Sequence, residues 1–307
     1  MSVNLKPWQF LTLAAAGAAL LVFAVTSLHP RPISQDADMV ALLPQKGQTI
    51  VYANVSLLRQ AGLPDLFASS TEDAEYRQFV TETHFDYRKD MDALAAAIGK
   101  DQYYFAVRGR FDWPRLKAYA RAHGGACTGD VCSTPTSKPG RWSSFFPIQA
   151  NVMALAVSTD RDAVSILHPH GRITPAAMPS RPVWAKVSHS LLDDPAAFPA
   201  PVEIFAAPLA QAREVVVSAG GDQAMEGETK GWSIQLAADC ASPMQARLLR
   251  DHLEERTGIL RRAMAREHNA ALNAGLMGMI ADGSFRLAEN KVVGIWPVHK
   301  ELLDSLH

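Results

Sequence analysis

Val51-Tyr52-Ala53-Asn54-Val55-Ser56 is a β-branched and aromatic stretch, and the chain restates it as Val183-Trp184-Ala185-Lys186-Val187-Ser188. Both copies predict a strand that leads into a short helix. A second pair follows, because Ser144–Leu167 is restated by Ser284–Leu306, and both segments predict strand, turn, strand and helix. The positions in step are Ser144/Ser284, Phe145/Phe285 and Val152/Val292. An internal duplication explains both pairs, and chance similarity of short strand–helix patterns is the alternative.

These repeats predict an α+β fold of two related halves. Helices alternate with paired strands that carry hairpin signals, which favours a largely antiparallel sheet over a doubly wound parallel one. We place the first half at 45–170 and the second at 183–307. The Pro-rich segment 171–182 between them is the predicted boundary.

Single elements can be predicted within the halves. Met91, Leu94, Ala95 and Ile98 fall at helical spacing after a capping Asp86, so we expect a helix over Phe85–Ile98. Other expected elements are a connector over Ser133–Arg141, a hairpin of Ser143–Ile148 and Val152–Val157, helices over Arg161–Leu167 and Glu203–Ala212, a strand over Glu214–Val217, a turn at Gly220-Gly221, a long helix from Pro243 to about His268 and a second helix over Asn269–Ile280.

The composition is that of a folded protein with no excess of charge. The 307 residues are 48% hydrophobic and 20% charged, and 30 basic residues face 31 acidic ones for a net charge of −1. A chain without a basic excess has little means to neutralise nucleic-acid phosphates, so nucleic acid is excluded as a partner. A polybasic tether to a membrane surface is excluded for the same reason.

An uncharged apolar run, Phe10–Leu28, precedes the halves. As a helix it would be roughly 28 Å long, close to the ~30 Å hydrocarbon thickness of a bilayer. We therefore expect a single transmembrane helix at 10–28, after a short cytoplasmic N-terminus at 1–9 and before a linker at 29–44. A cleaved signal peptide is the alternative, since Ala24–Ser27 offers small residues for cleavage.

The cysteines, together with the charges next to the apolar run, indicate on which side of the membrane the body lies. Cys127 and Cys132 bracket a turn-forming Gly129-Asp130, which favours a local disulfide and an oxidising compartment. Two free thiols or a zinc half-site are the alternatives. Cys240 follows an apolar strand pattern and is expected as a buried, inert thiol. Lys6 precedes the apolar run and slightly favours a cytoplasmic N-terminus by the positive-inside rule. Together these features predict a body outside the cytoplasm, as in a periplasm.

Several short motifs carry a family resemblance. They are Leu42-Leu43-Pro44, Val51–Val55, Leu57-Leu58-Arg59, Phe85-Asp86-Tyr87 and Gly109–Trp113. With these motifs the chain resembles uncharacterised bacterial families of N-terminally anchored extracytoplasmic proteins. The resemblance implies an anchor and duplicated α+β domains, and it implies no catalytic residue.

Candidate sites for chemistry are sparse. His168 and His170 are the sharpest metal candidates, but no third ligand is near them in the sequence, and two exposed histidines in a linker are the plainer interpretation. Asp86, Asp90 and Asp92 could include a general acid/base pair, although helix capping explains them without function. Neither nucleophile-elbow nor phosphate-loop motifs occur in the sequence.

Two further clusters could have a function. Arg256, Arg261, Arg262 and Arg266 form a basic patch late in the long helix, which is most simply a solvated face. The Met-rich AGLMGMI segment, with Met277, Met279 and Ile280, could present a partner-binding face, but ordinary core packing explains it as well.

From the sequence alone we expect a membrane-anchored extracytoplasmic protein without a cofactor or catalytic site. It would act as an accessory, scaffold or assembly component that binds the bilayer through Phe10–Leu28 and binds another membrane or envelope protein. The alternatives are an extracytoplasmic hydrolase with a site between the two halves, or a module that binds a small ligand or lipid in the groove between them.

Overall fold

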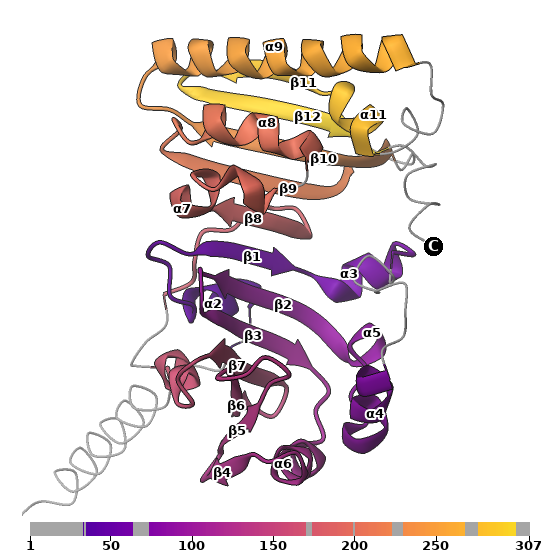
Figure 1. Ribbon diagram of the computed structural model, residues 1–307, viewed down its shortest axis with the longest axis vertical. Coiled ribbons are helices and arrows are strands. Elements are labelled where there is room, and N and C mark those ends of the chain that lie inside the picture. The colour runs from indigo at the N-terminus through magenta and orange to yellow at the C-terminus, as the bar shows by residue number, and fades with distance from the viewer. Residues whose placement is uncertain are drawn as a thin grey trace, which may run out of the picture.

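The structure is a computed structural model that describes residues 33, 35–63, 74–169, 174–198, 200–222, 230–267 and 276–298 (Figure 1). Its strands form one sheet in the order β11-β12-β10-β9-β8-β1-β2-β3-β7-β6-β5-β4. Each neighbouring pair is antiparallel. The fold is therefore α+β with a large antiparallel sheet, as the sequence predicts.

The strands are β1 Thr49–Ala53, β2 Met91–Ile98, β3 Tyr103–Gly109, β4 Ala126–Thr128, β5 Val131–Pro135, β6 Trp142–Gln149, β7 Val152–Ser158, β8 Val183–Val187, β9 Glu214–Asp222, β10 Lys230–Asp239, β11 Ser284–Ala288 and β12 Lys291–Pro297. The helices are α2 Asp36–Ala41, α3 Val55–Gln60, α4 Ala74–Thr83, α5 Tyr87–Asp90, α6 Trp113–Ala122, η2 Ala163–Leu167, α7 His189–Leu192, η3 Pro195–Ala197, α8 Ala200–Leu209, α9 Pro243–Glu267 and α11 Leu276–Ala281.

The two restated strands, β1 and β8, pair with each other at the middle of the sheet. Tyr52 lies opposite Trp184, and their rings stack with centroids 5.9 Å apart. Val51 pairs with Ala185 and Ala53 with Val183. Because the sequence match equates Val51 with Val183 and Ala53 with Ala185, this register is the one that a two-fold axis through the Tyr52–Trp184 pair would produce.

The strand order repeats outward from this seam. On one side the order is β1-β2-β3-β7-β6, and on the other it is β8-β9-β10-β12-β11. The described chain also follows a similar route in each half: a strand, helices, two strands, then α6 in the first half or α9 and α11 in the second, and finally two strands, β6–β7 or β11–β12. The first half adds the β4–β5 hairpin outside β6, whereas β11 forms the opposite edge.

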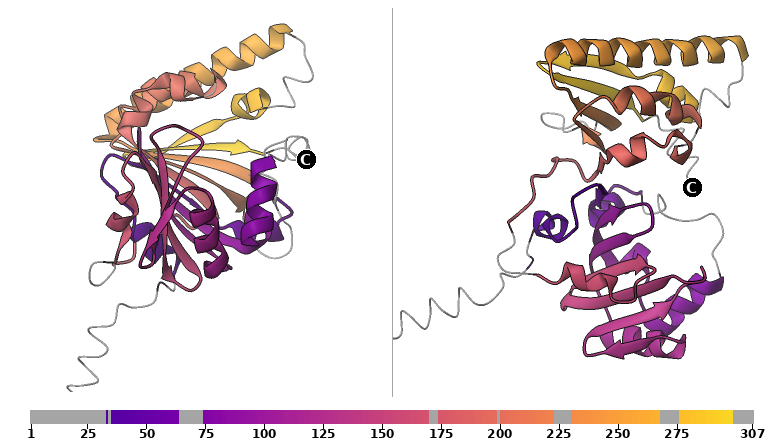
Figure 2. Two further views of the ribbon diagram at one scale, coloured as in Figure 1. Left: turned by 60° about the horizontal axis from the view of Figure 1, so that its bottom comes forward. Right: turned by 60° about the vertical axis from the view of Figure 1, so that its left-hand side comes forward.

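Helices cover the two faces of the sheet unevenly. Successive strand residues point to opposite faces, and Trp184 packs in one core cluster while Val187 packs against another. The first cluster joins α2 and η2 to one face of the first half. The second joins α8, α9 and α11 to the opposite face of the second half, and Figure 2 shows α8 and α9 together on one side of these strands.

The predicted helix over Phe85–Ile98 is wrong. Asp86 does cap a helix, and its carboxylate accepts the Arg88 N–H at 3.0 Å, but that helix is only the four-residue α5. Met91–Ile98 is the strand β2, between β1 and β3. A strand covered on both faces carries apolar residues at most positions, so its pattern can match a helix, and pairing on both sides overrides the helix preference of its alanines.

Several other predicted elements differ from the observed ones in smaller ways. Gly220-Gly221 is not a turn, because both glycines lie in β9 opposite Ser233 and Trp232. The connector predicted over Ser133–Arg141 begins as strand β5. The helix predicted over Arg161–Leu167 is the short 3-10 helix η2, and the one over Glu203–Ala212 is α8, which begins and ends three residues earlier. The hairpin β6–β7 and the long helix α9 are confirmed.

Parts of the prediction lie outside the described residues. These are the apolar run Phe10–Leu28, the first part of the linker, His170, the first part of the helix over Asn269–Ile280 and the final helix of Ser284–Leu306. The rest of the predicted linker 29–44 is described and contains the helix α2, Asp36–Ala41. Within the described ranges, no helix combines the length and the apolar character needed to cross a membrane.

Candidate functional site

A cleft lies at the seam between the two halves, and we call it the junction cleft. Its volume is about 580 Å³, within the range of small-molecule sites. It is lined by Val40, Ala41 and Gln45 beside α2, by Ile50 of β1, by Thr174, Ala176, Ala177, Met178 and Pro179 of the Pro-rich boundary, by Trp184 and Lys186 of β8 and by Glu214 and Val216 of β9. Both halves and the boundary therefore contribute to one cleft.

Helix α2 forms one wall of the junction cleft. Its start is fixed by a capping box, in which the Gln35 N–H donates to Asp38 Oδ2 at 3.0 Å. Beyond its end, Gln45 Nε2 donates to the Val40 carbonyl at 2.8 Å, so this side chain closes the last turn of the helix. The Ala176 N–H donates to the Ala37 carbonyl at 3.2 Å and joins the Pro-rich boundary to α2.

A partly buried polar network attaches α2 to the sheet. Asp36 accepts hydrogen bonds from the Tyr52 hydroxyl and, at 2.5 Å, from Arg108 Nη1. Tyr52 is only 2% exposed. Burial, followed by the hydrogen bond to Asp36 and the charge of that carboxylate, raises the pKa of Tyr52 well above its usual value. The hydroxyl therefore stays protonated and holds α2 in place at neutral pH.

The polar groups of the cleft are few. Lys186 and Glu214 form an ion pair at its margin, with both side chains about half exposed. Trp184 is 4% exposed, and its Nε1–H finds no hydrogen-bond partner among the described residues. The other lining residues are apolar except for Gln45 and Thr174. A largely apolar wall with a few polar groups is typical of a ligand site.

The lining holds few groups that could carry out catalysis. The described residues that line the cleft include no histidine, cysteine, serine or tyrosine. Lys186 and Glu214 neutralise each other, so neither is set apart as an acid or a base. The arrangement can hold a small, mainly apolar molecule and position a polar or charged group of it near the ion pair.

The two histidines proposed as metal ligands, His168 and His170, are not seen together as a site in the described part of the chain. The His168 ring stacks on Phe146, with centroids 4.0 Å apart, and His170 lies outside the described residues. Among the residues that the structure describes, no three histidine, cysteine or acidic side chains come together as metal ligands.

The acidic candidates cap and brace α5. Asp86 accepts from the Tyr76 hydroxyl at 2.8 Å, and Asp90 accepts from the Asp86 N–H at 2.9 Å. Burial would raise the pKa of Asp86, but hydrogen bonds from Tyr76 and the Arg88 N–H outweigh it and lower that pKa. These contacts give the carboxylates a structural role.

The cysteines behave as predicted in the described chain. Cys127 and Cys132 form a disulfide across the β4–β5 hairpin, where they are directly paired. Cys240 is a free and buried thiol, and burial raises its pKa, so it is a poor nucleophile.

The two remaining clusters take different roles. Met279 and Ile280 are buried in the second-half core, as ordinary packing predicts. The arginines lie on an exposed face, as predicted, and one of them also makes contacts: Arg261 donates from Nε to the Ala281 carbonyl at 2.6 Å and from Nη2 to the Gly283 carbonyl at 2.9 Å. Arg261 thus fixes the end of α11.

Comparisons with known proteins give limited information. No model of a known protein family matches the chain, and no curated protein matches it significantly. Among solved structures it is similar to crystal form III of TP0453, with a TM-score of 0.46 and 10% identity over 87% of this chain and 96% of that one. Crystal form I of TP0453 gives a TM-score of 0.45 and 9% identity over 88% and 97% of the two chains.

Proposed function

We propose that the chain is a non-enzymatic, extracytoplasmic binding protein, anchored by Phe10–Leu28, that holds a small ligand in the junction cleft. One observation carries the proposal: the cleft has the size and the mixed lining of a ligand site, and it lies where the two halves meet. The Cys127–Cys132 disulfide supports an oxidising compartment. The repeated strand order supports a duplication that brought two copies of one unit together at β1 and β8.

The ligand that fits is small and mainly apolar, and it carries one polar or charged group. The apolar part would lie against Ile50, Met178 and Trp184. The charged group would reach the Lys186–Glu214 pair, where either partner can satisfy it. The hydrolase alternative finds less support, because the described lining lacks a nucleophile beside a base.

Native mass spectrometry of the full-length protein, extracted in mild detergent, tests this proposal. We expect a small molecule to remain bound to the wild type and to be lost from Val216→Trp, because that side chain would fill the cleft. Val293→Trp is a matched control, since Val216 and Val293 lie on either side of Ala237 on one face of the sheet and both are half-buried. An empty wild type, or Val216→Trp with the same bound molecule, contradicts the proposal.

Docking to another envelope protein is a second candidate function. Met244 and Leu248 are 63% and 52% exposed one turn apart on α9, and Ile259, 43% exposed, lies three turns farther on the same face. Large apolar side chains in one exposed row favour a protein partner. The full-length protein should therefore co-purify with a partner, and Met244→Ser with Leu248→Ser should lose it while Leu57→Ser, at another exposed leucine, keeps it. A chain that runs alone at its own mass refutes this candidate.

A further inference from the structure

A second cavity lies in the other half of the molecule and on the other face of the sheet. Its volume is about 220 Å³, and we call it the α11 cavity. It is lined by Val202, Phe205 and Leu209 of α8, Val217 of β9, Ile234 and Leu236 of β10, Leu253 of α9, Leu276, Met279 and Ile280 of α11 and Trp296 of β12. Val217 and Trp184 belong to opposite faces, because Val217 is next to Ser218, which pairs with Trp184.

Every residue that lines the α11 cavity is apolar. A charged or strongly polar group placed inside would lose its hydration without gaining a partner, at a large cost. An apolar space of this kind stays dry and binds apolar molecules; a cavity of roughly 150 Å³ in another protein takes up benzene. The α11 cavity is larger than that, so an apolar occupant fits where water does not.

The wall of the cavity is held rigidly at one end and is open at the other. The end of α11 is fixed by Arg261, and the Ile280 carbonyl accepts a hydrogen bond from Trp296 Nε1 at 3.1 Å. The Trp296 ring also lies close to the backbone of Gly294: a side chain at Gly294 would bring its Cβ within 2.9 Å of the ring. Leu276, at the start of α11, lines the cavity and is still 40% exposed. The opening of the cavity therefore lies beside Leu276.

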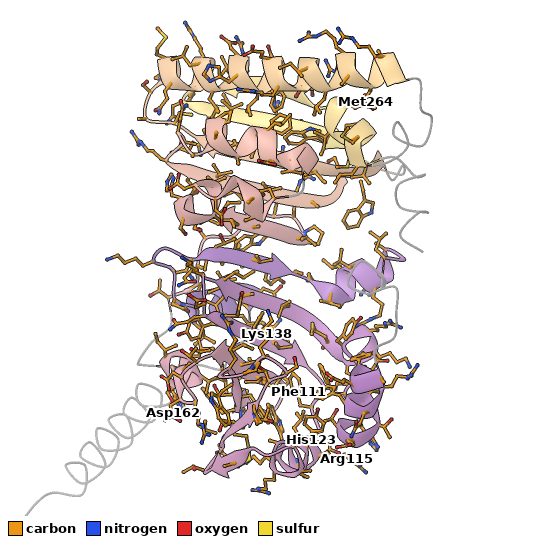
Figure 3. All side chains as sticks on the ribbon, in the orientation of Figure 1. Phe111, Arg115, His123, Lys138, Asp162 and Met264 are labelled. Carbon is orange, nitrogen blue, oxygen red and sulfur yellow. A yellow bond between two sulfur atoms is a disulfide. The ribbon has the colours of Figure 1, made fainter. Side chains whose placement is uncertain are left out.

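Aromatic side chains pack on the corresponding face of the first half, beside a pocket of about 230 Å³ that is lined by Val55, Tyr87, Met91 and Leu94. Phe111, labelled in Figure 3, stacks on Phe85 with centroids 5.1 Å apart and contacts Trp113 at the same separation. Phe79 packs against the same core cluster. Both halves therefore have a pocket on this face, and in the second half residues of α8, α9 and α11 wall it.

We propose that the α11 cavity binds the hydrocarbon chain of a single-chain amphiphile, with its polar end outside beside Leu276. Dividing 220 Å³ by the ~30 Å³ that a water-sized group occupies leaves room for about seven methylene-sized groups. The cavity holds the chain alone, so the polar end contributes little to affinity. This site is independent of the junction cleft.

The test uses the full-length protein in nanodiscs, labelled with 5-fluorotryptophan and titrated with straight-chain alcohols from butanol to decanol. The Trp296 fluorine resonance, assigned with Trp296→Phe, reports binding at this site. We expect a saturable shift, with affinity that rises roughly fourfold per added methylene until the chain holds about seven carbons, and then levels off. A fatty acid should bind within a few-fold of the alcohol of equal length.

Variants make the test specific. Val202→Phe should abolish the shift, and the milder Val217→Leu should shorten the chain length at which affinity levels off by about one carbon; circular dichroism checks that both fold. Ile259→Phe, on the exposed face of α9, should bind like the wild type. The proposal is overturned if the Trp296 resonance does not saturate, if Val202→Phe binds equally well, or if benzene derivatives bind better than alcohols of equal carbon number. Loss of the ligand in the junction cleft would leave these shifts unchanged.

Discussion

Tyr52→Phe is the substitution that tests most sharply how α2 is held over the junction cleft. The Tyr52 hydroxyl donates to Asp36, the first residue of α2, and Arg108 donates to the other oxygen of the same carboxylate. The substitution removes one hydroxyl from a site that is 2% exposed and leaves the ring stacked on Trp184. It therefore isolates one hydrogen bond to a partly buried carboxylate.

The expected cost follows from the charge of the acceptor. A hydrogen bond to a charged group contributes about 1.5–3 kcal/mol, and a neutral one about 0.5–1.5 kcal/mol. Because Asp36 keeps Arg108, we expect Tyr52→Phe to lower the free energy of unfolding by about 2 kcal/mol. Tyr104→Phe is the matched control: Tyr104 is 6% exposed, and its hydroxyl donates to the neutral Gln102 amide at 3.0 Å, so about 1 kcal/mol is expected.

Urea unfolding followed by tryptophan fluorescence measures both values, and a double-mutant cycle with Asp36→Asn isolates the pair. The pH dependence gives a second readout. The pKa of Tyr52 is raised in the folded state by burial first and Asp36 next, so the stabilisation is complete below the unfolded pKa of about 10 and is lost as pH rises above it. The difference between wild type and Tyr52→Phe should shrink there. A cost no larger than that of Tyr104→Phe, or no coupling to Asp36, refutes the reasoning.

Three further predictions concern the rest of the body. Replacing both Cys127 and Cys132 by serine should lower the unfolding free energy, measured in urea, by about 2 kcal/mol. The effect is modest because the disulfide closes a short loop, whose ends are five residues apart. Leu249→Ala should cost about 2–5 kcal/mol because Leu249 is 1% exposed, whereas Leu248→Ala, 52% exposed, should change it by less than about 0.5 kcal/mol. Arg261→Ala should speed amide exchange in α11 severalfold, while Arg262→Ala leaves it unchanged.

The sequence predicts the plan of the fold better than some of its single elements. The match between Val51–Ser56 and Val183–Ser188 predicts two equivalent strands, and these form the seam. It cannot show that they pair with each other, because strand partners depend on the whole chain. Periodicity fails at Met91–Ile98, where alanines with a high helix preference occupy a strand paired on both sides; pairing and burial override local preference.

The candidate site is only partly foreseeable. The Pro-rich boundary marks where a site between the halves would lie, and Thr174 and Ala176–Pro179 do line the junction cleft. Its other lining residues come from α2, β1, β8 and β9, which carry no catalytic or metal-binding motif that would link them in the sequence. The α11 cavity carries no sequence signal at all, since a void depends on how side chains from several elements fail to fill the space between them.

Amide hydrogen exchange of the full-length protein, as isolated and after its small molecule has been removed, tests the central claim most directly. The account predicts that the bound ligand slows exchange in α2 and in residues 176–178, which face the junction cleft, and leaves α9 unchanged. Equal exchange rates in α2 and 176–178 in the two samples, or slowing confined to α9, would contradict it.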